Sequence, residues 1–539
     1  MKQALAGFET ILLLLLGSAG LAVIGKRVAV PAPIMMVIGG LCVALAPGLP
    51  AVRIEPDLAF AIFVPPLLFR AALTTSLRGL RSNLRPVLLL AVGLVGASTV
   101  AVAAAAHFLL QQPWPTSFVL GAILSPPDAV VAISLARALR LPRRALSILE
   151  GETLLNDTTA FVLYRQALAA AVTGSFSLAK AVPQFVLVGA GGAAVGYVVY
   201  LVIRYARAHL KDPVLENVVW LLVPFFAFLP AEALHVSGVL SVVVAGVLLR
   251  QSSPLLVSAR TRVQANLSFD LVEFMLNSLI FVLIGMEVGH ILRDPSGPPL
   301  LELLRATAIV TLVLIAVRFA WMFPGAFLPH VLSERVRKTE KLPTVAGVTL
   351  LAWMGMRGGD SLVTALAVPH AIASGAPFPG RMLLVAVTFG VILATLLLQG
   401  LTLRPLMKVL RPPDDHAHEE EEKLARREMA KAGDERLTEL HREGVPAHVV
   451  EKVRHHHKKR SSLEMKLADP EAAHADGDAR HHQRAQQELL RARREAVVKL
   501  RNDDVIDDEV LRHLEQELDL EEMRLDLAAG DGAEPDDSL

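Results

Sequence analysis

The 539-residue chain has a single cysteine, Cys42. One cysteine excludes an intrachain disulfide, and it cannot supply the several thiolates of a metal cluster. Charged residues are also scarce, at 19% of the chain, whereas hydrophobic residues make up 53% and the mean hydropathy is +0.48. Because a soluble globular domain carries about 25% charged residues, this composition excludes an ordinary soluble protein of this length.

What the chain has instead is a succession of apolar runs within residues 1–411. Each is about 20 residues long, which is the length that spans a bilayer as a helix. The first run lacks a small-residue cleavage site and is expected to be retained. The pattern predicts an all-α polytopic membrane protein with about thirteen transmembrane helices. We expect these helices near residues 7–25, 29–48, 57–75, 86–109, 115–136, 145–171, 181–203, 213–233, 236–250, 266–290, 305–328, 343–370 and 382–403.

Lys and Arg are dense in every second segment between these runs and sparse in the others. By the positive-inside rule the dense segments face the cytoplasm. The alternation therefore predicts a multi-pass protein of the cytoplasmic membrane, with its N-terminus outside and its C-terminus inside. The dense segments lie at residues 26–27, 78–85, 137–144, 204–211, 250–262, 335–341 and 404–411.

The end of the chain has a different character. Residues 1–411 hold 32 basic and 18 acidic residues, whereas residues 412–539 hold 21 basic and 34 acidic residues. This contrast predicts a transmembrane domain, 1–411, and a cytoplasmic, charged, helical tail, 412–539. Eleven of the 17 histidines lie in the tail, which suggests a pH-sensitive regulator, although a solvated charged region fits the same composition. The histidines at 455–457 lack the ligand pattern of a zinc site.

Two of the predicted spans contain helix breakers at their centres. The fifth has Pro126 and Pro127 side by side, and the twelfth has Gly355, Gly358 and Gly359. Both spans are expected to unwind inside the membrane, where open backbone is tolerated only against protein or a wet cavity. If spans 1–6 and 8–13 form two inverted repeats, the two breaks occupy matching places. Matching broken helices are where a transporter binds its substrate.

A stripe of polar residues marks the sixth span. Glu152 and Asn156 are four residues apart, as are Thr153 and Asp157, so all four share one side of a helix. Asp128 lies at a similar depth in the neighbouring fifth span. Carboxylate, amide and hydroxyl oxygens suit a small alkali cation, and a buried carboxylate can exchange that cation for a proton. We expect Na⁺, or another monovalent cation, to bind at Asp157, Thr153 and Asp128, with Asn156 beside them.

Arg357 lies at the centre of the broken twelfth span, where an unpaired charge would be very costly. Glu152 is its expected partner, and Asp360 is a rival three residues away. A purely structural role for the Glu152–Arg357 pair, holding the two halves together, fits the same residues. Arg318 is expected to be a pairing or packing group.

These motifs resemble those of monovalent cation/proton antiporters, in the bacterial sodium/hydrogen-exchanger (NhaP/NHE-like) branch. The most specific stretch is 121–165, supported by 276–288 and 355–369. The resemblance implies thirteen helices with inverted repeats, a crossing of two unwound helices, and a homodimer with an elevator-like movement. It also implies that Asp157 binds the ion and the proton, and that Glu152 and Arg357 form a buried pair. Asn156 replaces the acid of the electrogenic branch, which implies electroneutral exchange.

The chain departs from this family at two positions. Pro127 stands where many members have a threonine, so a hydroxyl ligand is missing and the cation preference is left open. Asp360 stands where the family has an apolar residue, and it either competes for Arg357 or adds a second titrating group.

The expected function is therefore sodium/proton antiport, in pH and Na⁺ homeostasis. A K⁺/H⁺ antiporter and a non-transporting membrane sensor that uses the tail are the alternatives. An intramembrane aspartyl protease is disfavoured, because the chain reads Arg-Gly-Gly-Asp at 357–360 in place of the Gly-x-Gly-Asp signature. We expect no enzyme activity, no cofactor and no nucleic-acid partner; the expected partners are monovalent cations, protons, the lipid bilayer and a second copy of the chain.

Overall fold

A computed structural model of the chain gives its fold. The structure describes residues 2–28, 30, 32–45, 56–128, 132–133, 136, 141, 143–173, 178–209, 212–256, 259–293, 299–339, 342–369, 371–372, 375–410, 417–461, 476–503 and 505–530.

Helices make up nearly all of the described chain, and its one β-bridge joins Ala371 to Pro377. The first helices are Lys2–Val28 (α1), Ala32–Leu45 (α2), Pro56–Thr74 (α3), Leu77–Ser82 (α4), Leu84–Leu88 (α5), a π-helical turn Leu89–Leu94 (η1), Val95–Leu110 (α6) and Trp114–Leu124 (α7). The middle helices are Arg143–Thr173 (α9), Leu178–His209 (α10), Pro213–Ala233 (α11), Gly238–Leu256 (α12), Ala259–Arg293 (α13) and Leu300–Leu332 (α14). The last helices before residue 411 are Glu334–Thr339 (α15), Val345–Trp353 (α16), Gly359–Leu366 (α17) and Arg381–Leu410 (α18). Four more follow: Ala417–Arg442 (α19), Ala447–Ser461 (α20), Asp476–Asn502 (α21) and Asp508–Gly530 (α22).

Several of these helices are long and apolar enough to cross a membrane. Within the described residues there are six such helices, and four shorter apolar ones accompany them. The six are Leu84–Leu110, Val186–Arg207, Val214–Ala233, Ala259–Met286, Leu300–Leu332 and Arg381–Leu410. Although α9 has 31 residues, it is not among them, because its polar stripe lowers its hydropathy. The prediction of an all-helical membrane protein is thus confirmed in its class.

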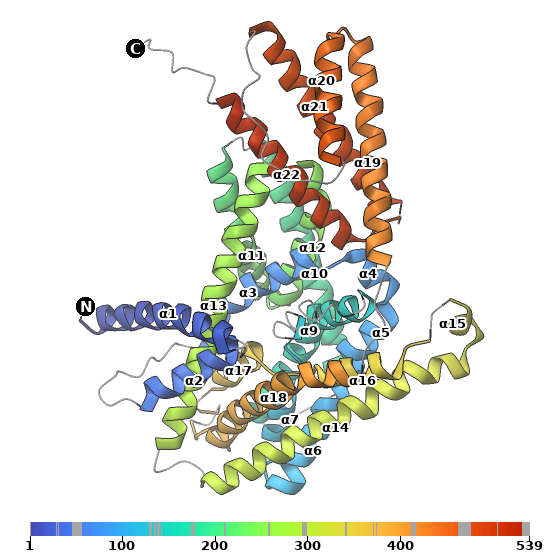
Figure 1. Cartoon of the computed structure of the whole chain (residues 1–539). Helices are drawn as coiled ribbons and strands as arrows, with labels where there is room; N and C mark the ends of the chain where they lie inside the picture. The colour runs from blue at the N-terminus through green and yellow to red at the C-terminus, as the bar shows by residue number, and fades with distance from the viewer. Residues whose placement is uncertain are drawn as a thin grey trace.

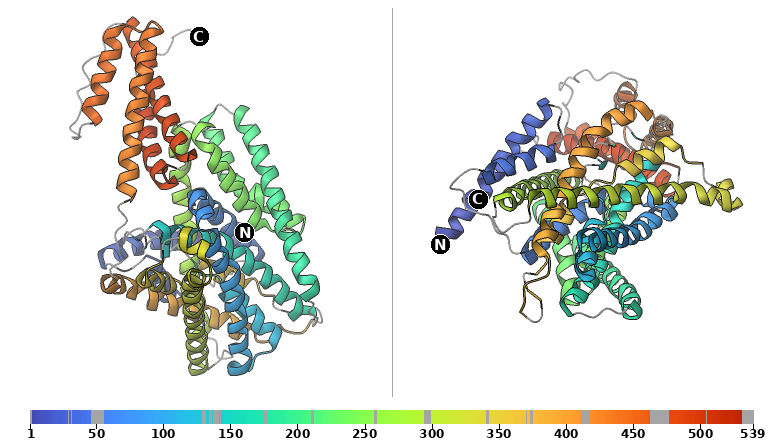
Figure 2. Two further views of the ribbon diagram at one scale, coloured as in Figure 1. Left: turned by 90° about the vertical axis from the view of Figure 1, so that its right-hand side faces the viewer. Right: turned by 90° about the horizontal axis from the view of Figure 1, so that it is seen from below.

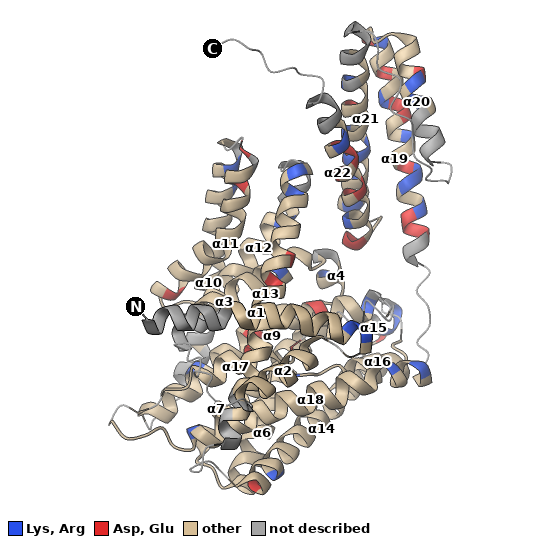
Figure 3. Ribbon diagram, turned by 60° about the vertical axis from the view of Figure 1, so that its left-hand side comes forward, with Lys and Arg blue, Asp and Glu red and all other residues tan. Residues whose placement is uncertain are grey.

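The charged helices α19 to α22 gather at one end of the molecule, where α22 packs against the apolar helix α13 (Figures 1 and 2). Figure 3 shows that Lys, Arg, Asp and Glu crowd these four helices, while the rest of the molecule is mostly uncharged. The four helices have apolar cores of their own, such as the one around Leu490, Val497 and Leu514. These four helices belong to the predicted tail, 412–539.

The helices around the two predicted breaks form the centre of the molecule. α7 packs against α6 and α9, while α17 packs against α3, α7, α13 and α18. A π-helical turn interrupts the helix between α5 and α6, and there Trp321 Nε1 donates to the Leu89 carbonyl at 3.0 Å. Because such turns release a backbone carbonyl from the helix, a side chain of α14 is able to dock on it.

Candidate ion-binding site

Two helices end abruptly where the sequence predicts breaks. α7 ends at Leu124, before Pro126 and Pro127, and residues 355–358 are non-helical between α16 and α17. The two open segments meet, because the Asp128 amide donates to the Met356 carbonyl at 2.8 Å. The prediction of two unwound segments is therefore confirmed, and the structure adds a direct backbone contact between them.

The Asp128 side chain forms a further hydrogen bond across this crossing. Its carboxylate accepts a hydrogen bond from the Gly359 amide, the first residue of α17, at 3.0 Å. A Cβ atom on Gly358 would lie 1.7 Å from Asp128 Oδ2, so only glycine allows the carboxylate to come this close. A negatively charged carboxylate at a helix N-terminus also interacts favourably with the helix dipole. In this structure Asp128 is a helix cap at the crossing.

Asn156 ties α9 to the same place. Its side chain is fully buried, and Nδ2 donates to the Pro127 carbonyl at 3.0 Å. A carbonyl before a broken helix has lost its intrahelical donor, so the amide replaces the missing bond. Asn156 Oδ1 is buried and has no hydrogen-bond partner within the described residues.

The structure gives Glu152 a different partner from the one predicted. Arg318 of α14 binds it through two hydrogen bonds, Nη1 to Oε1 at 2.6 Å and Nη2 to Oε2 at 2.9 Å. Both side chains are about 2% exposed. Arg318 also donates to the Leu351 carbonyl from Nε at 3.3 Å. The predicted Glu152–Arg357 pair is thus corrected to Glu152–Arg318, because α14 brings a guanidinium into planar, two-pronged contact with the acid.

Arg357 is buried as predicted, but backbone carbonyls receive its hydrogen bonds. Nε donates to Leu124 at 2.5 Å and Nη1 to Gly355 at 2.7 Å, while its amide donates to Thr395 Oγ1 at 3.1 Å. Leu124 is the last residue of α7, whose carbonyls carry partial negative charge. The guanidinium therefore caps the broken end of α7, and this satisfies Arg357 without the buried acid that the sequence analysis required.

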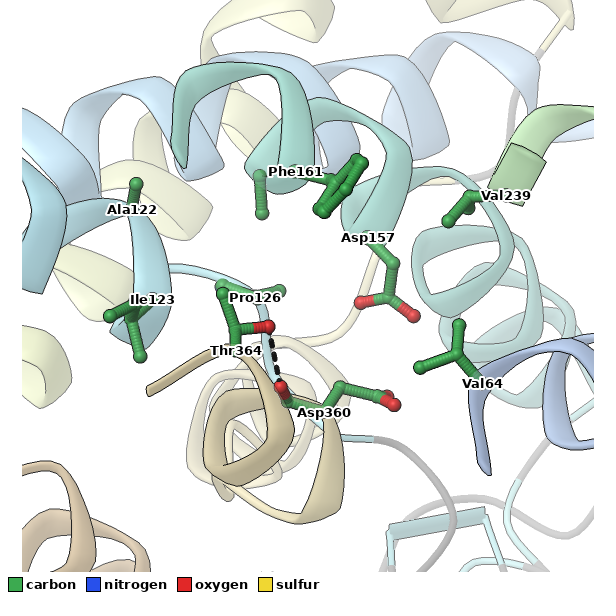
Figure 4. A pocket seen from close by; sticks show the side chains of 10 residues that line it. Val64, Ala122, Ile123, Pro126, Asp157, Phe161, Val239, Asp360 and Thr364 are labelled. Atoms are coloured by element: carbon green, nitrogen blue, oxygen red, sulfur yellow. Dashed lines mark hydrogen bonds between the residues drawn. The ribbon is translucent and has the colours of Figure 1, made fainter. Parts of the chain in front are cut away.

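A small cavity of about 30 Å³ lies beside the crossing. Its polar lining consists of Asp157 from α9 and of Asp360 and Thr364 from α17, and Figure 4 shows both carboxylates beside the cavity. The remaining lining residues are Val64, Ala122, Ile123, Pro126, Ala160, Phe161 and Val239. Asp157 Oδ2 is buried and has no hydrogen-bond partner among the described residues. A volume of this size accommodates one or two water molecules or a small cation.

Of the three predicted cation ligands, Asp157 lines this cavity. Asp128 lies at the crossing, and the Thr153 hydroxyl donates to the Leu149 carbonyl at 2.9 Å on its own helix. Asp360 stands out in the sequence as a departure from the family pattern, whereas Thr364, which lies one helical turn beyond it, was not predicted. Nowhere in the described chain do three or more His, Cys, Asp or Glu side chains gather as a metal-binding group would.

Comparison with known proteins agrees with this geometry. The family described as "Sodium/hydrogen exchanger, transmembrane" matches residues 11–409. A protein of Mycobacterium tuberculosis named as an uncharacterized Na⁺/H⁺ exchanger is 36% identical over 515 residues, which cover 93% of each chain. A sodium, potassium, lithium and rubidium/H⁺ antiporter of Bacillus pumilus is 33% identical, over 74% of this chain and 61% of its own length.

A solved structure supports the same fold. The sodium proton antiporter MjNhaP1 of Methanocaldococcus jannaschii matches with a TM-score of 0.54 and 18% identity, over 76% of this chain and all of its own. The match to the family runs over the two broken helices, the buried acid of α9 and nearly all of the apolar helices. The chain is a member of the sodium/hydrogen exchanger family, whose members are cation/proton antiporters and not enzymes.

Proposed function

We propose that the chain exchanges Na⁺ for H⁺ across the cytoplasmic membrane by alternating access, and so contributes to pH and Na⁺ homeostasis. The observation that carries this proposal is the Asp157 carboxylate, which lines a small, mostly apolar cavity and has a buried oxygen without a hydrogen-bond partner in the described chain. A buried carboxylate in that state must take up a proton or a cation to avoid a large desolvation cost.

Competition for this one group is sufficient for antiport. Asp157 holds either a proton or a cation, and neither is released until the other replaces it. Asn156, the next residue, is neutral and is used in the contact with Pro127. A neutral residue at position 156 supports an exchange of one cation for one proton, because Asp157 is then the one carboxylate of α9 that lines the cavity.

The choice of Na⁺ is supported by the names of relatives, among them a low-affinity Na⁺/H⁺ antiporter of Synechocystis that is 31% identical over 75% of this chain. The Bacillus relatives, named for sodium, potassium, lithium and rubidium, favour a broader cation range as the second candidate. A non-transporting sensor is the remaining alternative, and it requires no exchange with any cation.

We also propose that the N-terminus lies outside and the tail in the cytoplasm, and that residues 1–411 and 412–539 act as transport and regulatory domains. Support comes from contacts of the tail with the basic segment 250–262: Glu515 binds Arg250 at 3.1 Å, and Asp519 binds Arg262. Both arginines belong to a segment that the charge alternation assigns to the cytoplasm. A homodimer is proposed from the family resemblance.

The test is proton movement in everted membrane vesicles that contain the full chain. Adding Na⁺ to energised vesicles is expected to release protons, and Asp157→Asn is expected to abolish that release while the protein is present in normal amount. Asp270→Asn is a matched control, since this acid of α13 is paired with Arg70 and lies outside the cavity lining. Normal exchange in Asp157→Asn contradicts the proposal. No release by Na⁺, K⁺, Li⁺ or Rb⁺ in the unchanged protein favours the sensor.

A further inference from the structure

Asp360 occupies the first turn of α17 and lines the same cavity as Asp157. The two acids come from different helices and are brought together by the crossing. In Figure 4 the Asp360 side chain extends along the cavity wall toward the side that Asp157 occupies. Asp360 is not needed as a helix cap, because Asp128 already accepts from the Gly359 amide. The fold therefore leaves this carboxylate available to the cavity.

Thr364 adds a third oxygen to the same wall. Its hydroxyl donates to the Asp360 backbone carbonyl at 2.7 Å, so its single proton is committed and its lone pairs remain. Within the described residues, the hydrogen bonds of Asp360 involve this backbone carbonyl and not its carboxylate. The cavity thus has two carboxylates and one hydroxyl oxygen, all acceptors, and its other lining residues are apolar or proline.

The buried arginines nearby are engaged elsewhere. Arg318 binds Glu152, and Arg357 donates to the carbonyls of Leu124 and Gly355. Two carboxylates facing one small apolar cavity without a donor carry a desolvation cost and a mutual repulsion. A monovalent cation placed between the two carboxylates reduces both the repulsion and the desolvation cost, and such a cation prefers hard oxygen ligands.

We propose that Asp360 is a second carboxylate ligand of the transported cation, with Thr364 as a hydroxyl ligand, so that α9 and α17 share the transport site. This inference rests on the proposed antiport function and deepens it. Many family members have a threonine at the position of Pro127, and this chain lacks that hydroxyl ligand. In the proposed site Thr364, from the other broken helix, supplies a hydroxyl in its place. Two carboxylates produce a stronger field than one, which favours the smaller cations Na⁺ and Li⁺ over K⁺ and Rb⁺.

The experiment measures the cation concentration for half-maximal exchange, with the full chain reconstituted in proteoliposomes. Asp360→Asn is expected to raise this concentration for Na⁺ and Li⁺ about tenfold or more, and for K⁺ and Rb⁺ by less. Thr364→Val is expected to raise the half-saturating Na⁺ concentration several-fold. Thr364→Ser retains the hydroxyl and is expected to keep that concentration near the value of the unchanged protein. Asp270→Asn, the same chemical change outside the cavity lining, is expected to leave it unchanged.

An unchanged half-saturating Na⁺ concentration and an unchanged cation ranking in Asp360→Asn overturn the inference. If that variant does not transport, binding of ²²Na⁺ to the purified protein decides: wild-type affinity overturns the inference, and lost affinity supports it. If Asp360→Asn does not fold, as judged by gel filtration, the Thr364 variants are used instead. An unchanged half-saturating Na⁺ concentration in Thr364→Val overturns the inference, whereas a raised concentration that Thr364→Ser does not show supports it. Failure of the antiport proposal is recognised separately, because the unchanged protein then shows no exchange or Asp157→Asn retains it.

Discussion

At the scale of single residues, the Glu152–Arg318 pair connects three helices. Glu152 belongs to α9, Arg318 to α14, and the carbonyl that also receives Arg318 belongs to Leu351 of α16. Gly355 makes room for this arrangement, since a Cβ there would lie 2.5 Å from Arg318 Cδ. A buried, two-pronged ion pair contributes little net stability, but breaking it leaves an uncompensated charge. Its role here is to fix which helices meet.

Glu152→Gln is therefore expected to destabilise the protein by about 3 kcal/mol or more, because Arg318 stays buried without its counter-charge. The measurement is the thermal midpoint of the detergent-solubilised protein. In the fraction that folds, the half-saturating Na⁺ concentration is expected to stay near that of the unchanged protein, since Glu152 does not line the cavity. Glu302→Gln, an exposed acid in the first turn of α14, is the control. A wild-type midpoint in Glu152→Gln contradicts the role assigned to the pair.

The buried charged residues of the membrane part were predictable from the sequence, but their partners were not. Glu152, Arg318 and Arg357 each stand out as charges inside apolar runs. Their pairing depends on which helices are neighbours, and the hydropathy of a single chain does not encode that. Arg357 does not need a carboxylate partner, because the broken end of α7 presents backbone carbonyls that its guanidinium can cap.

At the scale of elements, the crossing of the two open segments holds the site together. Asp128, Asn156 and Ser361 each bind across it: Asp128 to α17, Asn156 to the Pro127 carbonyl, and the Ser361 hydroxyl to the Ile123 carbonyl at 2.8 Å. These bonds satisfy backbone groups that the broken helices release. The positions of the breaks were predictable from two prolines and three glycines. The different roles of the two acids were not predictable: Asp128 binds backbone, whereas Asp360 faces the cavity. These roles depend on how the two segments cross.

Gly358→Ala is expected to disrupt this crossing, since its Cβ would occupy the place of Asp128 Oδ2. Overpacking of this kind costs about 1–3 kcal/mol, and here it displaces a helix cap as well. The expected result is a lower thermal midpoint together with a loss of most Na⁺-driven proton release in vesicles. Gly325→Ala in α14 has open space around its new Cβ and is expected to keep both properties. Equal behaviour of the two variants contradicts the proposed geometry of the crossing.

At the scale of the whole molecule, α22 attaches the tail to the apolar helices. The hydroxyl of Ser76, which caps α4, lies 2.9 Å from both Asp507 Oδ1 and Asp508 Oδ2, so it can donate to either carboxylate. Asp519 binds Arg262 of α13 and also accepts from Arg494 of α21 at 2.7 Å. The charge contrast along the sequence separated the tail from the membrane part. It did not reveal that tail acids pair with arginines at the ends of α12 and α13, because both partners look like ordinary solvated charges when read singly.

Asp519 is expected to make this attachment sensitive to pH. Burial raises the pKa of its carboxyl to about 7, although Arg494 pulls the pKa down and Glu515 adds to the rise. Arg262 and Arg250 are the charged groups that α13 and α12 present near it. The tail histidines that the sequence suggested as sensors stay a prediction, whereas this acid lies at the contact itself.

The sign follows from the raised pKa. A free aspartate loses its proton near pH 4, while the docked Asp519 keeps it to about pH 7, so we expect docking to be strongest at acidic pH. Docking is expected to weaken by up to tenfold per pH unit as the pH rises toward 7, and to be constant above that. The measurement is disulfide cross-linking between Ser76→Cys and Asp508→Cys in a Cys42→Ser background. Asp519→Asn in the same background removes this pH dependence while retaining the pH effect on the thiols themselves, so identical pH profiles with and without Asp519 contradict the assignment.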